Sequence, residues 1–360
     1  MQRHLPAGQA RRRLYAGLVA GLALLASGCA SLRYYAHVTH GEVALLAARR
    51  PIAAVVADPH TSVDLRERLR RAQAARAFAS AQLALPHNRS YTSYVQLDRP
   101  YVVWNVFATP EFSVDPLTHC FPFAGCVAYR GYFDEAGARG EAARLAARGD
   151  DTAVLGVVAY STLGWFADPV LSSMLRWGDD ELDGVIFHEL AHQLLYVRDD
   201  TAFNESYATF VQDEGLREWR AAHGLPARDD AARAHDTAFT RLVLDLRERL
   251  RRVYASGLDA TAMRAAKQRE FKAFRTRYAA LRDGAWPDDH RHDRRVAGPL
   301  NNADLVPFGL YDRWVPAFAR LFSDAGRNWP AFHARVKALA RLPRAERDQA
   351  LARLAPDAAG

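Results

Sequence analysis

Apolar residues recur every three or four positions over long parts of the chain, which is the period of amphipathic helices. The pattern is clearest at residues 229–254 and 260–281, which a Ser-Gly pair at 256–257 separates. This arrangement predicts a helical hairpin at about 229–282. Further helices are expected at 33–50, 62–85, 134–148, 179–196 and 203–222, with two or three more over 310–355.

A smaller part of the chain has the composition of β-strands. Residues 91–107 are rich in Tyr, Val and Trp and predict one or two strands, and residues 127–133 predict a short one. The run AVLGVVAY at 153–160 is the clearest pattern for a buried strand. Residues 110–126 and 284–309 have the Pro and Gly content of loops. The pattern therefore predicts an α+β fold, with a small sheet within about 90–165 and a mostly helical remainder.

The first 29 residues have the pattern of an export signal. A basic stretch at 11–13 precedes an apolar run at 14–26, which is too short to cross a bilayer. The following ASGC at 26–29 resembles a bacterial lipobox, in which a lipid is attached to the cysteine and the peptide is cut before it. We therefore expect a lipoprotein signal peptide at 1–28, lipidation of Cys29 and a single domain at 29–360.

The residues after Cys29 are not of the type that retains Gram-negative lipoproteins in the inner membrane. By this resemblance we expect a lipid anchor in the outer membrane and a protein that faces the periplasm. An ordinary signal peptide that is cut nearby is the alternative. Cys120 and Cys126 agree with export, because they enclose a short turn-forming segment and can pair in an oxidising compartment. The alternative for this cysteine pair is metal ligation.

Composition and charge are those of a globular protein. The 360 residues are 49% hydrophobic and 25% charged, with a net charge of +7. Four arginines and no acid lie in residues 1–28, so the remainder carries only +3. Because that remainder mixes Arg with Asp and Glu, a solvated surface is favoured over a nucleic-acid-binding one. We expect no nucleic-acid partner.

The most informative run is GVIFHELAHQLLYVRDDTAFNESYATFVQDE at 184–214, which contains the HExxH motif His188-Glu189-x-x-His192. Positions four apart lie on one face of a helix, so both imidazoles can bind one tetrahedral Zn²⁺ ion, and Glu189 can act at its open position. The apolar residues around the motif are typical of a buried helix, where these polar groups are costly without a partner or a metal. A hydrogen-bonded pair of core histidines is the alternative.

Glu205, within NESYA, is the candidate third ligand. It follows the second histidine by 13 residues, which leaves room for a short turn and a second helix that returns alongside the first. Thr209 and Asp213 follow it by one and two helical turns and are candidates to hydrogen-bond a ligand histidine. The alternative for Glu205 is an acid that the helix dipole favours. His223 and His235 are rival ligands in more polar surroundings.

HELAHQ followed by NESYA resembles the gluzincin type of zinc metallopeptidase, in which two His and one Glu hold the metal. More closely, several segments resemble the bacterial "putative aminopeptidase" lipoprotein family. These segments lie at 121–133, 159–169, 185–197, 203–211 and 299–318. The resemblance spans nearly the whole mature chain and implies a single metallopeptidase domain of zincin-like fold. That fold would have a small sheet packed on the active-site helix, ligand helices within 179–222 and a large, mostly helical C-terminal part.

A site of this kind predicts one Zn²⁺ ion, held by His188, His192 and Glu205, with water as fourth ligand. The ion lowers the pKa of that water toward about 7. Glu189 takes the proton as a peptide carbonyl is attacked and passes it to the leaving amine. A second hydrogen-bond donor normally stabilises the tetrahedral intermediate. Tyr311 and Tyr160 are its candidates, and an aromatic core or rim position is the alternative for both.

The function predicted from these residues is zinc-dependent hydrolysis of peptides by a lipid-anchored aminopeptidase. A zinc endopeptidase that acts on envelope proteins and a non-catalytic lipoprotein are the alternatives. An aminopeptidase needs an acid for the substrate's α-amine, for which Asp168 and Asp304 are candidates without further support. The strand at 153–160 is expected either to line the cleft, where an extended peptide adds to it, or to lie in the sheet interior. Ser161 lacks the GxSxG context of a nucleophile.

Overall fold

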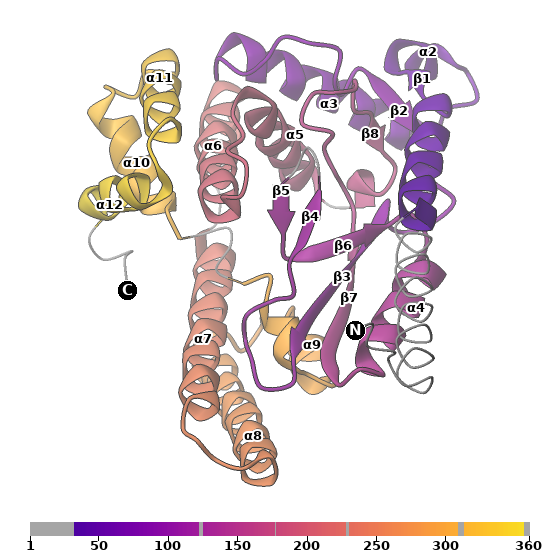
Figure 1. The fold of residues 1–360 in the computed structure, drawn as a ribbon. Helices are drawn as coiled ribbons and strands as arrows, with labels where there is room; N and C mark the ends of the chain where they lie inside the picture. Colours follow the sequence, from indigo (N-terminus) through magenta and orange to yellow (C-terminus); the bar gives the residue numbers. More distant parts are fainter. Residues whose placement is uncertain (1–31, 122–124, 177, 228–229, 309–312, 356–360) are drawn as a thin grey trace, which may run out of the picture. The chain divides into compact units, whose positions relative to one another are not determined.

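The computed structural model describes residues 32–121, 125–176, 178–227, 230–308 and 313–355 (Figure 1). The chain divides into two compact units, Met1–Ala48 and Arg49–Gly360. In the first unit, residues 32–47 form a helix, as predicted. The signal segment and Cys29 lie outside the described residues. None of the helices in the described ranges has the length and apolar character needed to span a membrane.

The strands of the second unit form small sheets. The largest has β3 (Val103–Pro110) at its centre, with β6 (Tyr129–Tyr132) and β7 (Asp150–Val157) antiparallel on either side. A second sheet has the order β1 (Arg50–Pro51), β2 (Ser93–Val95) and β8 (Val170–Leu171). β4 (His119–Phe121) and β5 (Gly125–Val127) form a hairpin. The α+β class is confirmed.

Different elements cover the two faces of the largest sheet. Trp104 and Val106 pack against α4 (Glu135–Ala146), whereas Phe107 on the opposite face packs near the short helix η2 (Asn302–Leu305). The principal helical partner of the sheet is therefore α4, and not the helix of the HExxH motif that we expected from the family resemblance.

The HExxH motif lies in α5 (Asp179–Leu194), which packs against α3 (Val63–Ala81) and α6 (Thr201–Ala222) (Figure 1). An ion pair between half-buried Arg71 and buried Asp183 joins α5 to α3, because both Nε and Nη2 of Arg71 lie 2.7–2.8 Å from Asp183 Oδ2. Burial raises the pKa of Asp183 to about 6, although Arg71 opposes this shift.

The remaining helices are α2 (Ile52–Ala57), η1 (Met174–Arg176), α7 (Asp230–Tyr254), α8 (Ala260–Ala285), α9 (Asp293–Ala297), α10 (Val315–Asp324), α11 (Trp329–Ala340) and α12 (Arg344–Leu354).

The predicted helical hairpin is confirmed as α7 and α8, which run side by side (Figure 1). Phe239, Leu246 and Leu250 of α7 pack with Phe271 and Phe274 of α8 in a buried cluster. The stripe read from the sequence is thus the contact face of the pair, as expected for helices that bury one side.

Three local predictions need correction. Residues 110–126 were expected to form a loop but contain the β4–β5 hairpin, and 284–309 contain α9 and η2. The run at 153–160 was expected to be a buried strand, but β7 covers Asp150–Val157 and is mostly half-buried. The reason is its position, because β7 lies at the edge of its sheet and pairs only with β3 among the described strands.

A buried histidine links α11 to the rest of the second unit. The hydroxyl of Tyr207 donates to His333 Nδ1 at 2.9 Å, and His333 Nε2 donates to the carbonyl oxygen of Leu83 at 2.9 Å. Burial lowers the pKa of His333 to about 4. In neutral His333 both ring nitrogens make a hydrogen bond. Protonation of Nδ1 therefore breaks the bond from the Tyr207 hydroxyl.

We predict that His333 makes the protein less stable in acid. Its pKa in the folded state is about 4, below the unfolded value of 6.5, so its stabilisation is lost as the pH falls from about 6.5 to 4. Asp183 changes stability in the opposite sense over this range, because its folded pKa is raised. The measurement is therefore the difference in unfolding free energy between wild type and His333→Gln, which should fall by about 3 kcal/mol over this range.

The matched control is His87→Gln, at an exposed position. This variant shows the effect of replacing a histidine outside the core. A His333→Gln difference that does not change between pH 6.5 and 4 would contradict the role assigned to His333.

Candidate metal centre

Two neighbouring helices bring the three predicted ligands together. His188 and His192 lie one turn apart on α5, and Glu205 lies in the second turn of α6. His188 Nε2 is 3.1 Å from His192 Nε2, and Glu205 Oε2 is 3.3 Å from the first nitrogen and 3.5 Å from the second. These three residues form a group whose ligand atoms could hold one metal ion.

The size of this triangle suits zinc. Bonds of about 2.0–2.2 Å in a tetrahedral site separate the ligand atoms by roughly 3.3–3.6 Å. The three distances of 3.1, 3.3 and 3.5 Å lie at or close to this range. Two imidazoles and one carboxylate are also a donor set that zinc prefers. The residues present therefore fit a zinc ion.

The electrostatics of the three side chains are those of a compact, buried charge cluster. Burial acts to raise the pKa of Glu205, but the two histidines outweigh it and hold this pKa well below its usual range. Burial acts to lower the pKa of His192, but Glu205 and Glu189 outweigh it and raise this pKa. The carboxylate is thus ionised and available as a ligand throughout the neutral range.

The turn between α5 and α6 positions Glu205. Asn204 Oδ1 accepts from the backbone N–H of Val197, and Asn204 Nδ2 donates to the carbonyl of the same residue, both at 2.7 Å. Asp200 caps α6 by accepting a hydrogen bond from the N–H of Phe203. Its carboxylate also forms a buried ion pair with Arg347 of α12. These contacts fix where α5 ends and where α6 begins.

Two further residues of the NESYA motif attach α6 to distant parts of the chain. Ser206 Oγ accepts from the N–H of Trp314 at 3.0 Å, and Tyr207 donates to His333 as described above. Ala208 is fully buried. The sequence predicted a ligand role for Glu205 and an apolar packing role for Tyr207, but not these hydrogen bonds, because their partners lie far away along the chain.

Glu189 is partly buried beside the ligands. Burial raises its pKa, with Glu205 and Asp168 acting in the same direction and the two histidines opposing them. A carboxyl with a raised pKa binds a proton more readily, which suits a group that accepts one during a reaction.

Two of the further candidate residues have other partners in the structure. The ring of Tyr160 packs edge-on against Phe133 at 5.8 Å, and Asp213 forms an ion pair with Arg233 of α7. Thr209 makes no hydrogen bond to either ligand histidine within the described ranges. Tyr311 lies outside the described residues.

The rival ligands and the candidate amine anchors have other partners. His223 Nδ1 bonds the carbonyl of Trp219, and His235 pairs with Asp289. The carboxylate of Asp168 accepts four hydrogen bonds, from Ser161, Gln193 and two groups of Thr162. Asp304 caps η2 by accepting from the N–H of Asn301. Both carboxylates are thus used within the fold.

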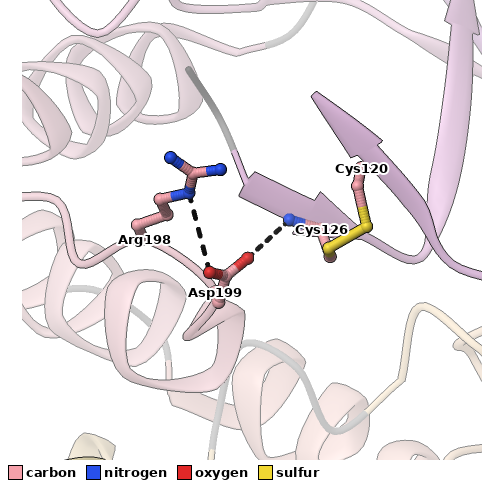
Figure 2. The surroundings of a disulfide bond; sticks show 4 residues. All are labelled: Cys120, Cys126, Arg198 and Asp199. Atoms are coloured by element: carbon pink, nitrogen blue, oxygen red, sulfur yellow. Dashed lines mark hydrogen bonds and ion pairs between the residues drawn. A yellow bond between two sulfur atoms is a disulfide. The ribbon is translucent and has the colours of Figure 1, made fainter. Parts of the chain in front are cut away.

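A disulfide between Cys120 and Cys126 closes the β4–β5 hairpin, which contacts the segment after α5 (Figure 2). The N–H of Cys126 donates to Asp199 Oδ1 at 2.6 Å, and Arg198 Nε lies 3.6 Å from Asp199 Oδ2. Gly125 has a φ of +76°, and a Cβ there would collide with the Asp199 carboxylate. The hairpin thus supports the turn that leads to the third ligand.

The comparison with known families agrees with this site. The family model described as "Putative aminopeptidase" matches residues 33–351. The chain belongs to this family. Membership supports a peptidase function and a peptide substrate. Neither a curated protein nor a solved structure matches the chain significantly.

We predict that Glu205→Gln weakens zinc binding by at least about a hundredfold, because a neutral amide replaces the anionic oxygen next to the two histidines. Zinc affinity of the purified protein is measured by titration against a chelator. Glu214→Gln is the matched control on the same helix, since Glu214 pairs with Arg217 and Arg327 instead. Equal affinities for Glu205→Gln and the wild type would remove Glu205 from the ligand set.

Proposed function

We propose that this protein is a zinc-dependent aminopeptidase. The observation that carries the proposal is the triangle of ligand atoms formed by His188, His192 and Glu205, with the side chain of Glu189 beside it. The family to which the chain belongs supports the peptide substrate. A core histidine pair would not need a third, anionic group at the same distance from both rings.

The three ligands and Glu189 would have different roles in peptide hydrolysis. His188, His192 and Glu205 would hold the ion, which when bound supplies a Lewis acid for the scissile carbonyl and lowers the pKa of water. Glu189 is not among the three grouped ligands, so its carboxylate remains available to accept a proton and return it to the leaving amine. The α5–α6 turn keeps the ligands fixed throughout.

The edge of β7 is the surface that we assign to the peptide backbone. β7 pairs with β3 on one side only among the described strands, and Asn301 Nδ2 donates to the carbonyl of Thr152 near its start. The strand ends at Val157, four residues before Ser161, which belongs to a hydrogen-bonded group that includes Gln193 of α5. We propose that an extended substrate pairs with the last residues of this edge.

An endopeptidase is the second candidate. It is favoured by the finding that Asp168 and Asp304 are both used within the fold, so neither carboxylate is available to hold a substrate α-amine. The test compares short peptides that have a free N-terminus with the same peptides after N-acetylation. Cleavage of the free peptides alone supports the aminopeptidase, and cleavage of both sets supports the endopeptidase.

We predict that Glu189→Gln abolishes peptide hydrolysis, with a loss of at least about a thousandfold in kcat, while zinc binding stays intact. The amide keeps the size of the side chain but cannot accept the proton. Glu181→Gln, on an exposed position in the first turn of the same helix, should keep full activity. Retained turnover in Glu189→Gln with zinc present would show that another group is the base.

We further propose that the protein is anchored by a lipid on Cys29 and faces the periplasm from the outer membrane. The proposal rests on the basic stretch, the apolar run and the ASGC sequence at the N-terminus. A peptidase held in this way would act on peptides within the envelope.

We predict that Cys29→Ala releases the protein from the membrane fraction. A thioether-linked lipid needs the cysteine sulfur, so the variant cannot incorporate radiolabelled palmitate in growing cells. Cys126→Ala is the matched control, because it removes a cysteine of the disulfide and should still be labelled. Equal labelling of Cys29→Ala and wild type would place the lipid elsewhere or exclude it.

A further inference from the structure

A group of polar side chains lies against the face of α5 that carries Glu189. Gln193 is one turn after Glu189 and so shares its face. Its Nε2 donates to Ser90 Oγ at 3.2 Å and to Asp168 Oδ2 at 3.1 Å. The segment around Ser90 is thereby attached to the face of α5 that carries Glu189.

Tyr91 follows Ser90 and has an unusual backbone. Its φ is +61°, a left-handed conformation that is unfavourable for a large side chain. Both of its backbone polar groups are held, since its N–H donates to the carbonyl of Asp168 and its carbonyl accepts from Gln73 Nε2, each at 2.6 Å. Such strain persists only where the surroundings impose it, and it occurs preferentially at functional sites.

The phenol of Tyr91 is buried, at 2% exposure, next to charged groups of the site. Its hydroxyl makes no hydrogen bond of normal geometry within the described ranges, although buried hydroxyls are nearly always paired. Burial and the nearby carboxylates of Glu189 and Asp168 raise the pKa of Tyr91 well above 10. The phenol therefore keeps its proton and is a donor at every working pH.

Of these two carboxylates, Glu189 has the greater free capacity to accept the proton of Tyr91. Asp168 already accepts four hydrogen bonds. Glu189 accepts none from the described part of the chain. The buried hydroxyl of Tyr91, which also lies near Ser161, is thus close enough to interact electrostatically with a carboxylate that accepts no hydrogen bond from the described residues.

We propose that Tyr91 is a positioning residue, whose hydroxyl donates a hydrogen bond toward the Glu189 carboxylate and fixes its orientation at the metal centre. The two groups make no direct bond in this structure, so the contact forms when the Glu189 side chain turns or through a shared water. The inference rests on the proposed function, in which Glu189 is the base.

The first test measures catalysis by Tyr91→Phe. We expect kcat to fall ten- to a hundredfold while KM and zinc content change less than twofold, because the substrate and the ion are bound by other groups. Tyr94→Phe is the matched control, a buried tyrosine three residues away whose hydroxyl bonds Gln96. A kcat for Tyr91→Phe equal to that of Tyr94→Phe would overturn the proposal.

The second test does not depend on activity. A double-mutant cycle compares the effect of Tyr91→Phe on the folding equilibrium of the metal-free protein in two backgrounds, wild type and Glu189→Ala. We expect a loss of about tenfold in the first and less than twofold in the second, since a hydrogen bond to a carboxylate is lost only in the first. Tyr94→Phe should cost the same in both.

Equal losses for Tyr91→Phe in the two backgrounds would overturn the pairing with Glu189. A wild-type protein that cleaves no peptide would instead overturn the proposed function. In that case the cycle would still show whether the two side chains interact.

Discussion

The turn that joins α5 to α6 is the constraint on which the site depends. The two histidines on α5 supply only two ligand atoms of a metal site. The third, from Glu205, is in place only if α6 begins at the right residue after the turn. The side-chain amide of Asn204 sets that place, because it satisfies both the N–H and the carbonyl of Val197. Each of these bonds contributes about 1 kcal/mol net, and a larger cost follows if either backbone group is left buried without a partner. The amide thus fixes the turn and the reach of Glu205 together.

Charge burial is concentrated around α5. This helix buries His188, His192 and Asp183, and Glu189 is largely withdrawn from water. Unpaired charges in such surroundings would destabilise the fold by several kcal/mol each. The structure compensates on two sides, with Arg71 against Asp183 toward α3 and Glu205 against the histidines toward α6. The low dielectric that makes these groups costly also strengthens their effect on a bound cation and on the proton affinity of Glu189.

Features that repeat with helical period could be predicted from the sequence, and features that join distant segments could not. The HExxH helix, the helical hairpin and the return of Glu205 follow from local spacing and apolar stripes. The hydrogen bonds between Asn204 and Val197, the bond from Trp314 to Ser206 and the role inferred for Tyr91 depend on partners that no local pattern indicates. The sheet lies within the predicted part of the chain, but the helix that covers it was wrongly expected to be the HExxH helix, since the packing of α4 on β3 and β7 joins segments that no local pattern links.

The C-terminal helices support the candidate metal centre although they supply no proposed ligand. Arg347 of α12 pairs with the Asp200 cap, Trp314 bonds Ser206, and His333 of α11 bonds Tyr207. These contacts fall on the first two turns of α6, on both sides of Glu205 along the chain. A carboxylate ligand on a helix end attached at one point could move with the fraying of that end. Attachment at three points, to three separate segments, removes that freedom, which explains why a site made of two helices is accompanied by so large a helical region.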